Sequence, residues 1–221
     1  MSEAGNSVAD PVPAADTSEA LNSGKGREII DGARRVFFDK GFDGASVDEI
    51  ARAAGVSKAT IYAYFDGKED LFRAVVKVDR SRSAEVMFEL CADAPDVESL
   101  LHRIGTSFMT MMVQPDHIRL IRMVIGAAEK FPRAGQAFYD SGPCMGRSRL
   151  GALLADQVRQ GRLAIDDCDT AAAQFFNLCQ GNIVKELLFS GNGAPTPELI
   201  DATVTSAIKV FMAAYSPRAA D

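Results

Sequence analysis

Residues 46–72 read SVDEIARAAGVSKATIYAYFDGKEDLF, and this stretch predicts two short helices joined by a tight turn. Ser46, with a glutamate three residues later, forms the capping box that begins a helix. Gly55 tolerates the positive φ at which a helix ends, and Ser57 can accept the first amide hydrogen bonds of the next helix. Two short helices separated by about three residues have the spacing of a helix-turn-helix.

The second of these helices has an apolar face and an opposite face of small residues. If Ile61 and Phe65 point into the core, a rotation of about 100° per residue puts Ala59 and Ala63 on the outside. That outer face suits the major groove of DNA, which an α-helix can enter. We expect base contacts from Ala59, Thr60 and Ala63, and phosphate contacts from Ser57, Lys58, Tyr62, Tyr64 and Lys68. The spacing also fits an ordinary corner between two helices of an all-α bundle.

Outside this stretch, helical periodicity continues and strand signals are almost absent. Apolar residues recur along residues 25–40, and Gly41 follows them as an expected C-terminal cap. Asp66 with Glu69 is expected to open a long fourth helix. The remaining chain predicts helices over residues 96–113, 115–130, 133–160 (interrupted by Gly142-Pro143), 167–190 and from Thr196 onward. An all-α fold follows.

The composition divides the chain into three parts. Residues 1–23 are rich in Ala, Pro, Ser, Asp and Asn and lack apolar periodicity, so we expect a disordered arm. Residues 24–72 hold the helix-turn-helix, and residues 73–221 should form a larger helical body. A chain of 221 residues, of which 47% are hydrophobic, can bury a substantial core.

Charge and special residues narrow the classes of protein. A net charge of -6 argues against non-specific coating of nucleic acid, although residues 24–80 carry a slight basic excess. The four cysteines lack metal-ligand spacing, so we expect free thiols, no metal and no cofactor. No secretory signal and no run of about 18 apolar residues is present, which predicts a cytoplasmic protein with no membrane partner.

Residues 55–72 resemble the signature of the TetR/AcrR family of bacterial regulators, and the resemblance is dense over residues 27–72. It implies a three-helix DNA-binding domain followed by a helical ligand-binding and dimerisation domain. The positions that match the family's usual DNA contacts are Ser46, Ser57, Lys58, Thr60, Tyr62, Tyr64 and Lys68. Relatives often carry a bulky residue at position 63, so the base contact of a larger side chain should be missing at Ala63.

The second half of the chain resembles the AefR-like type of C-terminal domain, through Phe131-Pro132, residues 138–143 and Gly161-Arg162-Leu163. Together the two resemblances imply a transcriptional regulator, most often a repressor. They also imply a homodimer that binds double-stranded DNA at a palindromic operator and is released by a small, mostly apolar effector of unknown identity.

Other functions stay open as alternatives. The chain has only two histidines and no Ser/His/Asp arrangement, phosphate loop or HExxH motif, so we do not expect an enzyme. The acidic cluster of Asp166, Asp167 and Asp169 precedes a helix, where capping is the first explanation. A helical small-molecule-binding protein, or an enzyme, without operator binding is the alternative function.

The helical body contains apolar residues that could line an adaptable ligand pocket. The candidates are Phe108, Met112, Met123, Phe138 and Phe175, although ordinary core packing accounts for each of them equally simply. Arg122 lies in an apolar run, so it could anchor an anionic ligand group. Pairing with a carboxylate or reaching to solvent are the alternatives for this arginine.

The last two predicted helices are candidates for a dimer interface, in which two helices from each subunit form a four-helix bundle. The candidate contacts are Leu178, Gly181, Lys185, Leu188, Phe189, Ile208, Phe211, Met212 and Tyr215. We expect ligand binding to change the spacing of the two recognition helices, with the fourth helix acting as a lever.

Overall fold

The computed structural model describes residues 23–89, 94–190 and 193–217. It confirms the all-α prediction, because no strand forms within those ranges. The elements are α2 (Gly24–Gly44), α3 (Val47–Ala54), α4 (Lys58–Tyr64), α5 (Lys68–Glu89), α6 (Val97–Met112), α7 (Pro115–Ala128), α8 (Pro132–Tyr139), the π-helical turn η1 (Asp140–Cys144), α9 (Met145–Arg159), α10 (Cys168–Gln180), α11 (Ile183–Ser190) and α12 (Pro197–Tyr215).

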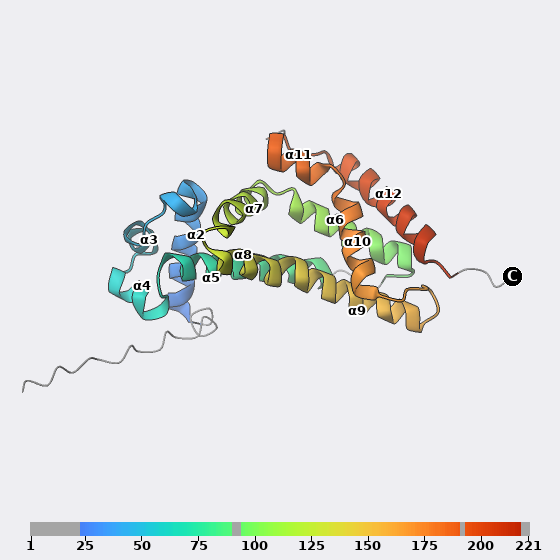
Figure 1. The fold of residues 1–221 in the computed structure, drawn as a ribbon, viewed down its shortest axis with the longest axis horizontal. Coiled ribbons are helices and arrows are strands. Elements are labelled where there is room, and N and C mark those ends of the chain that lie inside the picture. Colours follow the sequence, from blue (N-terminus) through green and yellow to red (C-terminus); the bar gives the residue numbers. More distant parts are fainter. Residues whose placement is uncertain (1–22, 90–93, 191–192, 218–221) are drawn as a thin grey trace, which may run out of the picture.

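The molecule is elongated, and different helices lie at its two ends. Figure 1 shows α3 and α4 at one end, with α9, α10 and α12 toward the other. Helix α5 starts beside α4 and runs from the first end into the body, while α7 lies beside α2. The helix-turn-helix is therefore joined to the body both through the chain and through side-by-side packing.

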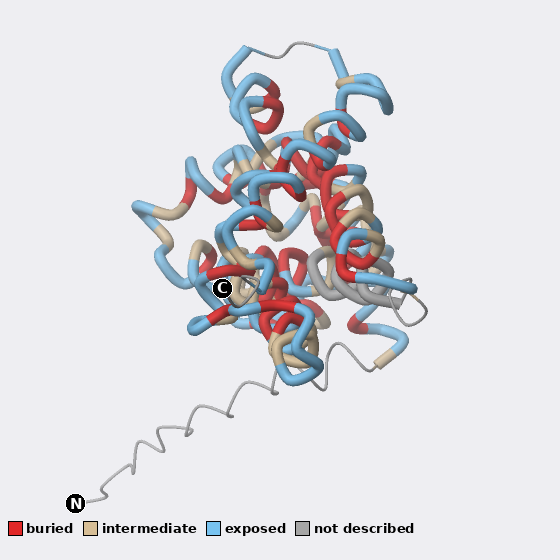
Figure 2. The backbone as a smooth tube through the Cα atoms, turned by 90° about the vertical axis from the view of Figure 1, so that its right-hand side faces the viewer, coloured by how far each residue is buried: buried red, intermediate tan, exposed pale blue. Residues whose placement is uncertain are grey.

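Two hydrophobic cores stabilise this arrangement, as the buried stretches on the inner sides of the helices in Figure 2 indicate. One core lies between α6, α9, α10, α11 and α12. The other contains Phe37, Ile61 and Phe72 of the helix-turn-helix end, and also Leu120 and Val124 of α7. Helix α7 thus contributes to the core of the end that was predicted as a separate small domain.

Several predicted helix boundaries have the local cause that the sequence indicated. Gly41 adopts a φ of 73° and interrupts α2. Thr196 accepts a hydrogen bond from the Leu199 amide and begins α12, with a proline in its first turn. Pro143 lies in η1, where the wider π-helical turn accommodates a residue without an amide hydrogen.

The single helix predicted over residues 167–190 is wrong. Gly181 adopts a φ of 48° and divides the segment into α10 and α11. Apolar periodicity continues across the break, so the sequence pattern conceals it. The opening of α5 also differs in detail, because the Asp66 amide donates to the Asp70 carboxylate and not to Glu69.

Further sequence-based expectations concern termini, thiols and membranes. The predicted disordered arm lies outside the described residues except for Ser23, whose side chain accepts from the Gly26 amide and caps α2. Cys144, Cys168 and Cys179 are free thiols as expected, while Cys91 lies outside the described residues. Within the described part of the chain, each helix is too short or too polar to cross a lipid bilayer.

Candidate functional site

The turn between α3 and α4 has the geometry of a tight helix-turn-helix. The Glu49 amide donates to the Ser46 Oγ at 3.3 Å, and the Ser46 amide donates back to the Glu49 carboxylate at 3.3 Å. Gly55 ends α3 in the left-handed region with a φ of 67°. The Val56 amide then donates to the Ala51 carbonyl at 3.0 Å, so the end of α3 is closed by two successive backbone amides.

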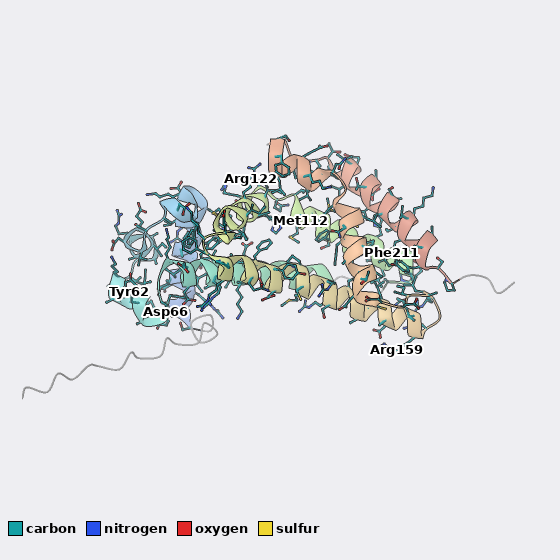
Figure 3. All side chains as sticks on the ribbon, in the orientation of Figure 1. Tyr62, Asp66, Met112, Arg122, Arg159 and Phe211 are labelled. Atoms are coloured by element: carbon teal, nitrogen blue, oxygen red, sulfur yellow. The ribbon has the colours of Figure 1, made fainter. Side chains whose placement is uncertain are left out.

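Helix α4 presents a polar N-terminus and buries one face. Ser57 accepts the Thr60 amide at 3.0 Å, and its hydroxyl also lies 2.8 Å from the Thr60 Oγ1. Ile61 and Phe65 are fully buried in the core, as predicted. The opposite side of α4 faces outward, and Tyr62 is 53% exposed at the tip of the molecule (Figure 3).

The nine residues predicted to contact DNA lie at this same end. Lys58, Ala59 and Ala63 are exposed on α4, and Ser46 and Lys68 are half-buried at the starts of α3 and α5. The rest, all on or next to α4 and exposed or half-buried, are Ser57, Thr60, Tyr62 and Tyr64. The structure therefore brings together small and polar side chains of the kind that a DNA groove accepts.

The cations of this surface are positioned by local partners. The Lys58 ammonium lies 3.0 Å from the Asp48 carboxylate, and this hydrogen bond is the main cause that raises the pKa of Lys58. The Lys68 ammonium lies 4.6 Å from the centre of the Phe42 ring, a cation–π geometry. Lys58 therefore has a competing anion within the protein, whereas Lys68 is held on an aromatic face.

Close packing of α2 against α3 fixes the orientation of the motif. A Cβ added to Gly32 would meet the Ala54 Cβ at 2.7 Å and the Ala54 Cα at 2.8 Å. Only a glycine permits this approach. Sequence reasoning missed Gly32, because a glycine inside a helical pattern carries no signal of what lies opposite it.

A cavity of about 410 Å³ lies in the helical body, between α6, α7, α8, η1, α9, α10 and α11. Three of the predicted ligand-binding residues line it, namely Phe108, Met112 and Phe138. The Phe108 and Phe176 rings lie 4.6 Å apart in its wall. Four further residues that were not among the predicted ligand contacts also line the cavity. They are His117 and Ile121, one turn apart on α7, together with Met111 and Arg147.

The other three predicted ligand-binding residues lie elsewhere. Arg122 donates to the carbonyls of Leu187 at 2.6 Å and Leu188 at 3.0 Å, near the end of α11, so it caps a helix. Met123 packs against the core of the helix-turn-helix end. Phe175 is fully buried, and its ring meets that of Phe211 edge-on at 5.6 Å, so it is a core residue.

The predicted dimer contacts also fall into two groups, those packed inside the protomer and those that face outward. Ile208 and Phe211 are buried within the protomer and are therefore unavailable to a partner. Leu188 lines the cavity, while Met212 and Tyr215 pack against the core. The outward-facing residues of the prediction are Leu178, Gly181, Lys185 and Phe189, and the exposed apolar residues Leu199 and Val210 on α12 were not predicted.

Comparisons with known proteins place these features in context. Residues 29–75 match the family described as bacterial regulatory proteins, tetR family. Residues 99–217 match the family described as AefR-like transcriptional repressor, C-terminal domain. A curated relative is the HTH-type transcriptional repressor AcnR of Corynebacterium glutamicum, 43% identical over 63 residues. That match covers 28% of this chain and 34% of the relative, so it spans about a third of the relative's length.

Solved structures match over much more of the chain. A structure described as a TetR-family transcriptional regulator from Mesorhizobium loti has a TM-score of 0.82 and 26% identity, covering 92% of this chain and 100% of that one. The flavonoid-responsive regulator FrrA has a TM-score of 0.74 and 30% identity, covering 88% of this chain and 98% of that one. These relatives are regulators and not enzymes.

Proposed function

This chain belongs to the TetR family of bacterial transcriptional regulators, with an AefR-like C-terminal domain, and we propose that it binds a palindromic DNA operator as a homodimer. We further propose that it is a repressor that leaves the operator when a small, mostly apolar ligand enters the cavity. The outward face of α4, opposite the buried Ile61 and Phe65, is the observation that carries the proposal.

The surface chemistry of α4 supports entry into a major groove. Ala59 and Ala63 have short side chains at the centre of this face, so the helix can approach base edges and thymine methyl groups closely. Ser57, Lys58 and Tyr62 surround that centre with groups that can donate to phosphates.

A partner copy is supported by an exposed apolar surface on α10, α11 and α12. Leu178, Phe189, Leu199 and Val210 are 37%, 87%, 49% and 52% exposed. A contiguous patch of such side chains marks a protein interface. Leu199 and Val210 lie eleven residues apart, on one face of α12. Gly181, whose added Cβ would lie 3.5 Å from Thr203, places the end of α10 against this helix.

Helix α7 is the element that we propose to couple ligand and DNA. His117 and Ile121 on one face line the cavity, while Leu120 and Val124 on another belong to the core beneath the helix-turn-helix. A ligand that shifts α7 from its cavity side should therefore also change the packing of α7 against α2. Turn η1 lines the cavity and also contacts α5, which adds a second route to the same end.

The ligand class that we propose is a flat aromatic compound. Phe108, Phe138 and Phe176 line a space of about 410 Å³, within the usual range for small-molecule sites. One solved relative is named for its response to flavonoids, which are flat and aromatic. This supports the class of ligand and leaves its identity to experiment.

Selection of DNA by the purified protein tests the proposal. Genomic fragments are recovered on the immobilised chain, and the enriched sequence is footprinted at physiological salt. We expect two protected half-sites related by a two-fold axis. A footprint without that symmetry contradicts the dimer on a palindrome, and enrichment of no sequence favours the alternative of a ligand-binding protein without an operator.

A further inference from the structure

The cavity contains one strong positive charge. Arg147 on α9 lines it, and none of the described residues that line the cavity is an aspartate or a glutamate. An arginine stays protonated at every pH that a protein normally meets. Most of the remaining wall is apolar, so the charge lies in surroundings that strengthen its interaction with any anion that enters.

The hydrogen-bond partners of Arg147 are incomplete. Its Nε is buried and has no hydrogen-bond partner among the described residues. Its Nη2 lies 3.8 Å from the Cys144 Sγ, and a thiol sulfur is a weak acceptor. Nε and Nη2 form one edge of the guanidinium group, the edge with which arginine binds the two oxygens of a carboxylate.

The Asp167 carboxylate, whose pKa the charge of Arg147 helps to lower, is already engaged in another role. The Asp167 carboxylate accepts the Thr170 amide at 3.0 Å and the Thr170 hydroxyl at 2.6 Å, which caps α10. These bonds to Thr170 are the main causes that lower the pKa of Asp167, and the charge of Arg147 is the smallest of its causes. No ion pair between Arg147 and a described carboxylate forms within 4.0 Å.

We propose that Arg147 is the anion-recognition residue of the cavity, so that the effector is a flat aromatic compound carrying one carboxylate. This inference rests on the proposed ligand-binding function and adds the charge of the ligand. Burial of an arginine donor without an acceptor is unfavourable, and a carboxylate that supplies two acceptors would remove that cost. The apolar body of the ligand would pack between Phe108 and Phe176.

Two fluorescent probes that differ in charge test this inference. 8-Anilinonaphthalene-1-sulfonate is an anion, and N-phenyl-1-naphthylamine has the same aromatic skeleton without the sulfonate. Both probes are titrated into the full chain and into the Arg147→Met variant, and competition between them establishes that they share a site. We expect the variant to bind the anionic probe about 10-fold or more weakly and the neutral probe within about 2-fold.

Two further variants separate charge from packing. Arg147→Lys keeps a cation but loses the planar fork, so its affinity for the anionic probe should lie between those of wild type and Arg147→Met. Arg159→Met removes another arginine of α9, paired with Asp156 outside the cavity, and should change neither affinity. Displacement of the neutral probe by 1-naphthoate, but not by 1-naphthamide, would extend the preference to a carboxylate.

The outcomes separate this inference from the proposed function. Equal weakening of both probes by Arg147→Met, or no weakening of either, overturns the role in anion recognition while a ligand cavity stands. Failure of wild-type protein to bind either probe overturns the ligand cavity itself, and with it this inference. Thermal unfolding of each variant confirms that the compared proteins are folded.

Discussion

The Arg34 Nη2 lies 3.1 Å from the Asp116 Oδ2, so an ion pair joins the first helix of the helix-turn-helix end to α7 of the body. The same guanidinium reaches Asp79 on α5, with 3.3 Å between Nε and Oδ1. One side chain therefore contacts both of the elements that connect the cavity to the proposed DNA-binding face. Both carboxylates are partly exposed, so each ion pair contributes little to the free energy of unfolding.

The Arg34→Met variant should separate orientation from stability. Partly exposed ion pairs contribute little, so the free energy of unfolding should change by less than about 1 kcal/mol. Operator affinity should fall about threefold, because the fraction of molecules with a correctly oriented helix-turn-helix becomes smaller. Denaturant unfolding and fluorescence anisotropy measure the two quantities. Arg159→Met, which removes an ion pair at the opposite end (Figure 3), should leave operator affinity unchanged.

Two glycine substitutions should have opposite effects on stability. Gly32→Ala inserts a Cβ 2.8 Å from the α3 backbone, so we expect destabilisation by about 1–3 kcal/mol and weaker DNA binding. Gly126→Ala has no atom within 4 Å of the new Cβ and lies inside α7. It should stabilise the protein by about 0.5–1 kcal/mol. Equal effects in urea unfolding would contradict the close approach of α2 and α3.

The ion pair between Lys58 and Asp48 should restrain DNA binding. Asp48→Asn releases the lysine for a phosphate and removes an exposed negative charge from the same surface, so operator affinity should rise several-fold. Lys58→Ala should lower operator affinity and reduce the salt slope by about one unit. A double-mutant cycle measures whether the two effects on operator affinity are additive. Additive effects would show that Lys58 does not leave Asp48 to bind a phosphate of the operator.

Acid sensitivity should depend on carboxylates that cap helices. The pKa of Asp96 is lowered mainly by the backbone amide of Ser99 and then by its side chain. A carboxylate with a lowered native pKa stabilises the fold above its unfolded-state pKa of about 3.9, and that stability is lost as the pH falls through the native pKa. Asp96→Asn keeps a good cap but cannot titrate, so its stability should fall less steeply below about pH 4.

The control for acid sensitivity is Asp31→Asn, which removes a carboxylate from the middle of α2 where no helix end is capped. Each variant lacks one carboxylate, so the difference between their acid-unfolding curves isolates the contribution of the Asp96 cap. Acid unfolding is followed by circular dichroism. If the curves of wild type and Asp96→Asn coincide, the cap does not contribute to acid sensitivity.

The helix-turn-helix could be predicted because its signals are local. The capping box at Ser46, the left-handed Gly55 and the cap at Ser57 each act within a few residues. The buried positions Ile61 and Phe65 follow from helical periodicity alone. These features need no knowledge of the distant chain, so sequence and structure agree there.

The body was harder to predict because its helices are apolar on more than one face. Phe211 and Val210 are adjacent in sequence, but Phe211 is buried in the core and Val210 is 52% exposed. Periodicity cannot distinguish a core face from an interface face when both are apolar. Arg122 looked like a ligand anchor from its apolar surroundings, yet its partners lie about 65 residues later in the chain, at the carbonyls near the end of α11. Such long-range contacts leave no local trace.

The central claim is that the outward face of α4 reads the operator, and one comparison of affinities tests it most directly. Wild type and a Lys58→Ala, Tyr62→Ala double variant are titrated with the selected operator and with a scrambled duplex at physiological salt. Arg159→Ala, at the other end of the molecule, is the control. We predict that the folded double variant loses at least about 10-fold in operator affinity and most of its preference over scrambled DNA, while the control keeps both. Full operator affinity and preference in the double variant would contradict the assignment of α4 as the recognition helix.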